Sequence, residues 1–173
     1  ADYIERNIRI PEFARELEPE DYKVLVNLGR AYYNSGEYEN AERVLNKARE
    51  KENRNEQVYN LLGLIHIDQG NYQSAKEHFL SAVEMDDSNY YVLNNLGLNY
   101  IRQGKFEEAV KYLKKATDLK PEVAYIYNNL GIAYENLGQL EMAWVNYDQA
   151  LEINPDHNSA RTNLERVEAK LDD

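Results

Sequence analysis

Large apolar, small and polar residues recur along the chain in columns at one constant spacing. Four Leu-Gly pairs mark this period: Leu28-Gly29, Leu62-Gly63, Leu96-Gly97 and Leu130-Gly131. A constant period of about 34 residues is typical of an array of helical repeats, in which each repeat stacks on its neighbours. The pattern therefore predicts four repeats, at residues 22–55, 56–89, 90–123 and 124–157.

Each column has a steric role in a helix–turn–helix unit. Glycine and alanine let two helices approach closely, and a large apolar residue fills the space between them. A second glycine suits the turn after the first helix, because a left-handed residue at a helix end is usually glycine. Pro121 and Pro155 close two repeats, since proline cannot continue a helix. The columns are Gly36, Gly70, Gly104 and Gly138; Ala41, Ala75, Ala109 and Ala143; Leu45, Phe79, Leu113 and Tyr147; and Ala48, Ala82, Ala116 and Ala150.

The two ends of the chain differ from the repeats. Residues 158–173 place Ala160, Leu164, Val167 and Leu171 at helical spacing, which predicts an amphipathic capping helix over the last repeat. Residues 1–21 are open to two interpretations: a degenerate capping helix, or an arm that docks into a neighbouring molecule.

These columns resemble the tetratricopeptide repeat family, whose layout of Leu-Gly, Tyr, Ala, aromatic or Leu, Ala and Pro matches residues 22–157. The departures are mild: His66 stands in a tyrosine column, no repeat has tryptophan at its fourth position, and the first two repeats lack the proline. The resemblance implies an all-α fold, a right-handed superhelical solenoid of antiparallel helix pairs. It also implies a scaffold for protein–protein interaction rather than an enzyme.

The chain is acidic, with a net charge of −11. Proteins that bind nucleic acid usually concentrate Lys and Arg to displace counterions, so we expect no nucleic-acid partner. The charge alternates between repeats, with net values of +2, −5, +2 and −5 counted from the sequence. This alternation either orients a partner or a second copy, or is an ordinary solvated surface.

Cysteine is absent, and no apolar run reaches the ~20 residues of a membrane-spanning helix. We therefore expect neither a disulfide framework nor direct membrane insertion. A cytoplasmic location is the expectation, and an exported or membrane-anchored parent protein stays open because the chain starts at Ala1.

Catalytic and metal-binding motifs do not emerge from the sequence. His66, His78 and His157 include no two on one helix at ligand spacing, and there is no phosphate loop or nucleophile elbow. Acidic pairs such as Glu107-Glu108 are common on helix surfaces. The sequence thus predicts no enzyme activity and no cofactor.

The resemblance assigns ligand contact to the first helix of each repeat, at positions 2, 5, 6, 9, 12 and 13, which line a concave groove. Carboxamides recur there as an asparagine ladder: Asn27, Asn60, Asn94, Asn95, Asn128 and Asn129. A carboxamide both donates and accepts hydrogen bonds, so such a ladder can bind the backbone of a peptide. The alternative is that these side chains bond neighbouring helices or water.

The same positions hold an apolar patch with aromatic neighbours. Its members are Leu64, Ile67, Leu98, Ile101 and Ile132, flanked by Tyr91 and Tyr125; Arg30 and Arg102 occupy other groove positions. Exposed apolar patches usually mark interaction sites, although adjacent first helices could equally bury these side chains against each other. Together with the ladder, the patch predicts a partner segment that binds as an extended strand or an amphipathic helix.

The family's carboxylate clamp for chaperone tails requires lysine, asparagine and arginine at five of these positions. Here those positions hold Val26, Arg30, Leu61, Tyr91 and Asn95, and starting one repeat later gives Asn60, Leu64, Asn95, Tyr125 and Asn129. Neither set matches, so we do not expect a chaperone-tail receptor of that type.

Three functional hypotheses follow. The first is a scaffold that captures a peptide segment of a protein partner in its groove. The second is a self-assembling module that forms a homo-oligomer through its N-terminal arm or end helices. The third is the regulatory region of a larger multidomain protein.

Overall fold

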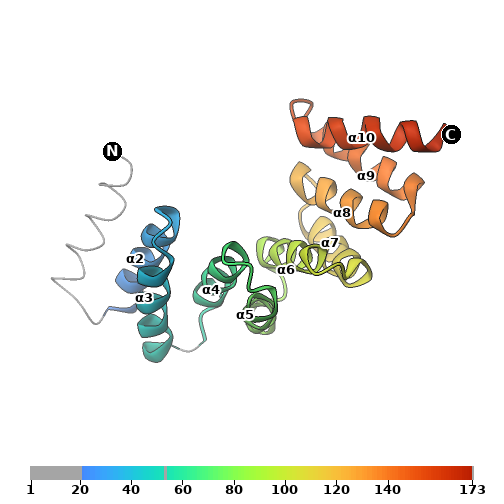
Figure 1. Cartoon of the computed structure of the whole chain (residues 1–173). Helices are drawn as coiled ribbons and strands as arrows, with labels where there is room; N and C mark the ends of the chain where they lie inside the picture. The colour runs from blue at the N-terminus through green and yellow to red at the C-terminus, as the bar shows by residue number, and fades with distance from the viewer. Residues whose placement is uncertain (1–20, 53, 173) are drawn as a thin grey trace. The chain divides into compact units, whose positions relative to one another are not determined.

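The fold is described by a computed structural model that covers residues 21–52 and 54–172. These residues form helices and no strand, which confirms the predicted all-α helical-repeat fold (Figure 1). The helices are α2 (Tyr22–Asn34), α3 (Tyr38–Lys51), α4 (Glu56–Asp68), α5 (Tyr72–Met85), α6 (Tyr90–Arg102), α7 (Phe106–Leu119), α8 (Ala124–Asn136), α9 (Leu140–Ile153) and α10 (Asn158–Leu171).

Each repeat pairs a first helix of 13 residues with a second helix of 14 residues. Polar side chains cap the beginnings of several first helices, because the first backbone N–H groups of a helix lack partners. Asp21 accepts a bond from the backbone N–H of Val24, and Asn55 accepts one from Val58. The second glycine of each repeat has a positive φ, as expected for the left-handed turn between the two helices.

The first glycine of each repeat sets the distance between the paired helices. A Cβ atom at Gly131 would lie 2.6 Å from the ring of Tyr147, and one at Gly63 would lie 2.5 Å from the ring of Phe79. No side chain fits in this space without displacing the large residue of the second helix. The Leu-Gly pairs therefore recur because the large apolar column packs against the glycine backbone.

The chain divides into two compact units, with the boundary between Asp86 and Asp87. The packing columns of the sequence run through this boundary without a break. The N-terminal unit contains α2 to α5, in which α4 contacts α2, α3 and α5. The C-terminal unit contains α6 to α10.

In the C-terminal unit, α8 packs against α6, α7 and α9, and α10 packs against α9 and α8. Ala160 of α10 is fully buried beside Ala124 and Ala150, as the predicted amphipathic pattern requires. Near the C-terminal end of α10, Nε1 of Trp144 in α9 donates a hydrogen bond of 3.0 Å to Oε1 of Glu168. Apart from Asp21, the predicted N-terminal arm at residues 1–21 lies outside the described residues.

Candidate functional site

The predicted ligand-facing residues lie on the first helices of the repeats. Two of these helices belong to each compact unit, so the units are described one at a time. In the C-terminal unit these helices are α6 and α8, and α10 continues their repeat register. Since α8 contacts both α6 and α10, the three helices share one surface, which we call the first-helix face. Its residues are Tyr91, Asn94, Asn95, Leu98, Ile101 and Arg102 of α6, Tyr125, Asn128, Asn129, Ile132, Glu135 and Asn136 of α8, and Thr162, Asn163, Arg166 and Lys170 of α10.

The asparagines of this face connect neighbouring first helices. Asn129 donates from Nδ2 to Oδ1 of Asn94 at 2.9 Å, and Asn163 donates in the same way to Asn128 at 3.0 Å. Both acceptors are buried. Identical carboxamides can pair because each is both donor and acceptor. Of the two roles that the sequence left open, bonding between helices is therefore the one observed for Asn94 and Asn128.

The aliphatic residues of the face are partly packed and partly accessible. Leu98, Ile101 and Ile132 are each half-buried. Tyr91 and Tyr125, in the first turns of α6 and α8, are 44% and 37% exposed. Burial above all, with the nearby Tyr90 and Tyr91, raises the pKa of Tyr125 to about 12. The Tyr125 hydroxyl therefore remains protonated, and able to donate a hydrogen bond, well above neutral pH.

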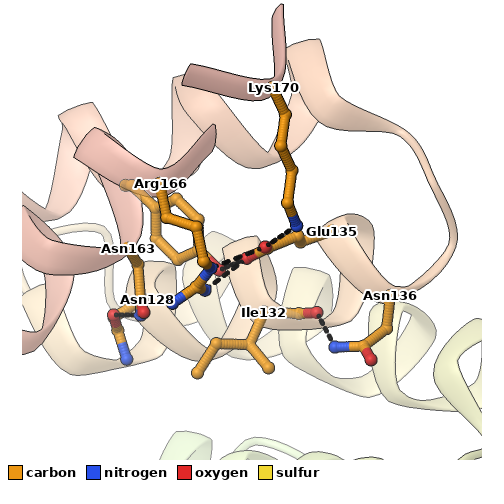
Figure 2. Close-up of polar contacts among 8 residues, drawn as sticks. Asn128, Ile132, Glu135, Asn136, Asn163, Arg166 and Lys170 are labelled. Atoms are coloured by element: carbon orange, nitrogen blue, oxygen red, sulfur yellow. Dashed lines mark hydrogen bonds and ion pairs between the residues drawn. The ribbon is translucent and has the colours of Figure 1, made fainter. Parts of the chain in front are cut away.

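The carboxylate of Glu135, in the last turn of α8, forms ion pairs with two cations of α10 (Figure 2). Arg166 donates to Glu135 from Nε at 2.9 Å and from Nη2 at 2.6 Å, and Lys170 donates from Nζ at 2.8 Å. The Tyr147 hydroxyl of α9 donates to the same carboxylate at 2.8 Å. These bonds, that of Arg166 above all, hold the pKa of Glu135 down at about 2 despite its partial burial. Burial and the adjacent carboxylate raise the pKa of Tyr147, so its hydroxyl stays a donor.

In the N-terminal unit the corresponding residues lie on α2 and α4. Asn27 and Arg30 are exposed, Asn60 is buried, and Leu64 and Ile67 are half-buried. Arg30 donates from Nη2 to Oε1 of Gln57 at 3.2 Å, across from α2 to α4. A shallow hollow of about 270 Å³ lies beside this contact, lined by Tyr22, Lys23, Val26, Asn27 and Gln57.

The site residues predicted from the sequence do not include the charged residues Glu135, Arg166 and Lys170 of the first-helix face. Glu135 falls at position 12 of its repeat, but the residues that pair with it come from the segment that the sequence treats only as a cap. The repeat spacing indicates that residues 158–173 contain a further first helix. One repeat length after Asn129, Ile132 and Asn136, the sequence has Asn163, Arg166 and Lys170. A fifth first helix in that register presents the same positions to the same surface.

The structure also brings together two histidines from different helices. His66 of α4 and His78 of α5 stack, with ring centroids 5.2 Å apart and planes 3° from parallel. Burial lowers the pKa of His78 to about 4, with smaller contributions from His66 and Arg49, while Glu77 opposes them. Nδ1 of His66 is buried and has no hydrogen-bond partner among the described residues.

The described residues form neither a metal-binding cluster nor a membrane-spanning helix. Within residues 21–52 and 54–172, no three His, Asp or Glu side chains are grouped so that they could hold a metal ion. Over the same residues, no helix has the length and apolar content to cross a membrane.

The comparison with family models agrees with this architecture. Residues 11–164 match the family described as the C-terminal domain of cilia and flagella-associated protein 70, which is a tetratricopeptide-repeat family. The chain therefore belongs to that family, and the resemblance to tetratricopeptide repeats is confirmed. A comparison with curated protein sequences gives no match.

Solved structures of other tetratricopeptide-repeat proteins are similar in fold. PilF of Pseudomonas aeruginosa is 25% identical, with a TM-score of 0.81 over 86% of this chain and 68% of PilF. YrrB, described as having an unusual peptide-binding site, is 23% identical, with a TM-score of 0.76 over 93% of this chain and 83% of YrrB. The first such domain of Spaghetti (RPAP3), solved with an HSP90 peptide, is 25% identical, with a TM-score of 0.67 over 68% of this chain and 94% of that one.

Proposed function

We propose that this chain is a protein-interaction scaffold that binds a peptide segment of a partner protein on its first helices. In the C-terminal unit, the segment lies along the first-helix face. The observation that carries this proposal is the combination of two exposed tyrosines with half-buried Leu98, Ile101 and Ile132 on one surface. Exposed apolar and aromatic groups that lie together on a surface usually mark an interaction site.

The asparagines have a double role in this proposal. Their Oδ1 atoms join neighbouring helices, as between Asn129 and Asn94, and so fix the spacing of the first helices. The Nδ2 groups of Asn94 and Asn128 take no part in these bonds, and we assign them to carbonyl groups of the bound segment. YrrB is described as having a peptide-binding site, and the Spaghetti domain was solved with a bound peptide. Both support a peptide as the kind of ligand for this fold.

The test changes the two exposed tyrosines of the first-helix face. Tyr91→Ala combined with Tyr125→Ala removes the two exposed rings of the face. Met142→Ala combined with Val145→Ala is the matched control, because these side chains are similarly exposed on α9, a second helix. Each variant serves as bait in a pull-down read by mass spectrometry, and its helicity is measured by circular dichroism.

The proposal expects partners that the wild type and the α9 control capture and that the tyrosine variant loses. Equal capture by all three proteins would disprove binding on this face. Capture lost from the α9 control instead would move the site to the second helices.

A further inference from the structure

The charge of the first-helix face is opposite to that of the chain. The whole chain carries a net charge of −11, and residues 124–157 contain five acidic residues and no Lys or Arg. Yet α6 carries only one charged residue, Arg102, and α8 carries only one, Glu135. Most acidic residues of these two repeats are instead on the second helices, such as Glu107 and Glu108 of α7.

The one carboxylate of α8 is covered by its cations. The side chain of Glu135 is only 9% exposed, whereas those of Arg166 and Lys170 are 46% and 48% exposed. Arg166 and Lys170 thus place two positive charges around one negative charge (Figure 2), and their side chains are more exposed than that of Glu135. Glu168 of α10 is directed away from this cluster, because it accepts the hydrogen bond from Trp144 of α9.

A third cation lies at the same margin of the face. Arg102 is in the last turn of α6, at the repeat position that Asn136 occupies on α8 and Lys170 occupies on α10. Its side chain is exposed and forms no ion pair within the part of the chain that the structure describes. The margin formed by the last helical turns is therefore cationic, while the opposite margin carries the exposed Tyr91 and Tyr125.

We infer that the partner segment bound by this face is acidic, with apolar side chains followed by Asp or Glu. This inference rests on the proposed function and adds the chemistry of the ligand. The apolar side chains contact Leu98 and Ile132, and the carboxylates lie toward Arg102, Arg166 and Lys170. Complementary charge directs such a segment to one margin of the face and fixes its orientation.

The test selects short random peptides from a display library on the immobilised full chain, with a parallel selection on the Tyr91→Ala, Tyr125→Ala variant. We expect the peptides that depend on the tyrosines to be enriched in Asp and Glu beside apolar residues. Enrichment in apolar residues without acidic ones, or with Lys and Arg, would overturn the inference and leave the proposed function standing. A selection that yields no tyrosine-dependent peptide would overturn both.

One selected peptide, labelled with a fluorophore, then measures the role of each cation by fluorescence polarisation. Arg102→Gln and Lys170→Gln should each weaken binding about three- to tenfold, and the loss should shrink as salt is raised. Lys114→Gln is the control, because Lys114 is equally cationic but is exposed on α7. Losses of the same size in all three variants would show that only net charge matters, which contradicts a defined site.

Discussion

Ionisable groups enter the helix interfaces of both units, but with different surroundings. In the N-terminal unit, His66 and His78 stack between α4 and α5, and Nδ1 of His66 is buried with no hydrogen-bond partner among the described residues. In the C-terminal unit, Glu135 lies between α8, α9 and α10 and accepts bonds from Arg166, Lys170 and Tyr147. The two clusters occupy nearly the same place in their repeats, since His66 and Glu135 are at positions 11 and 12.

The difference shows how burial and neighbouring hydrogen-bond donors together determine the protonation state of a side chain. Burial alone disfavours charge, so His78 stays neutral and its pKa falls to about 4. Burial with three donors favours charge, so Glu135 stays ionised and its pKa falls to about 2. The His78 ring therefore contributes to stability while it is neutral, and the Glu135 carboxylate contributes while it is charged. Four changes test this contrast, and we give them in order of decreasing effect.

Removing the charge of Glu135 should have the largest effect. Glu135→Gln leaves the guanidinium of Arg166, the ammonium of Lys170 and the Tyr147 hydroxyl without their carboxylate, and we expect a loss of about 2–3 kcal/mol in the free energy of unfolding. Trp144 is the only tryptophan and lies in the C-terminal unit, so urea unfolding followed by its fluorescence reports on this unit.

Glu141→Gln, at an exposed position of α9, is the control and should change stability by a few tenths of a kcal/mol at most. An equal loss in both variants would mean that the donors around Glu135 contribute nothing specific.

Acid should destabilise the N-terminal unit before the C-terminal unit. The pKa of His78 is lower in the folded state than the usual 6.5, so the unfolded chain takes up protons first as pH falls. The stability that the neutral ring provides is complete above pH 6.5 and is lost between pH 6.5 and about 4, by about 1–2 kcal/mol for a ring that is only partly buried. The contribution of Glu135 is complete above about pH 4.5 and is lost only between 4.5 and about 2.

The acid effect is measured by thermal unfolding at pH 7 and pH 5, followed by both circular dichroism and Trp144 fluorescence. His66→Tyr combined with His78→Tyr gives the second repeat the stacked tyrosine pair of the third, where Tyr100 and Tyr112 lie 5.6 Å apart. This variant should lose much less helical stability between pH 7 and pH 5 than the wild type. If its loss over that range matches that of the wild type, the acid sensitivity comes from other groups.

Removing one hydroxyl should have a smaller effect. Tyr147→Phe keeps the ring that packs against Gly131 and deletes only the bond to Glu135, so we expect a loss of about 1 kcal/mol. Because the hydroxyl stabilises the ionised carboxylate, the pKa of Glu135 should also rise, which NMR titration of its side-chain carboxyl carbon can detect. An unchanged pKa would show that Arg166 and Lys170 alone keep Glu135 ionised.

The fold could be predicted from the sequence because the residues that repeat are the residues that pack. Gly131 and Tyr147 belong to two columns, and each column has one steric task in every repeat. The division between Asp86 and Asp87 could not be predicted, since the columns continue across it unchanged.

The candidate site was predicted only in part. The ladder positions were correctly placed on the first helices, but the pairing of Asn94 with Asn129 depends on the offset between two helices, which the repeat period does not fix. The histidine pair and the Glu135 cluster were missed because each joins residues from different columns. Such residues do not recur at a fixed spacing, and only the packed helices bring them together.

The smallest effect should come from Lys170→Gln. The Lys170 ammonium is half-exposed, and Arg166 still neutralises Glu135 in its absence, so we expect a loss of a few tenths of a kcal/mol that shrinks further at high salt. Arg166→Gln should cost more, because the guanidinium forms two bonds to the carboxylate. Both values come from urea unfolding followed by Trp144 fluorescence at low and high salt. A larger loss for Lys170→Gln than for Arg166→Gln would contradict this ranking. The ranking also separates stability from binding, because Lys170 contributes little to the fold yet lies where we place an acidic partner, so a variant that folds normally and binds weakly is the expected result.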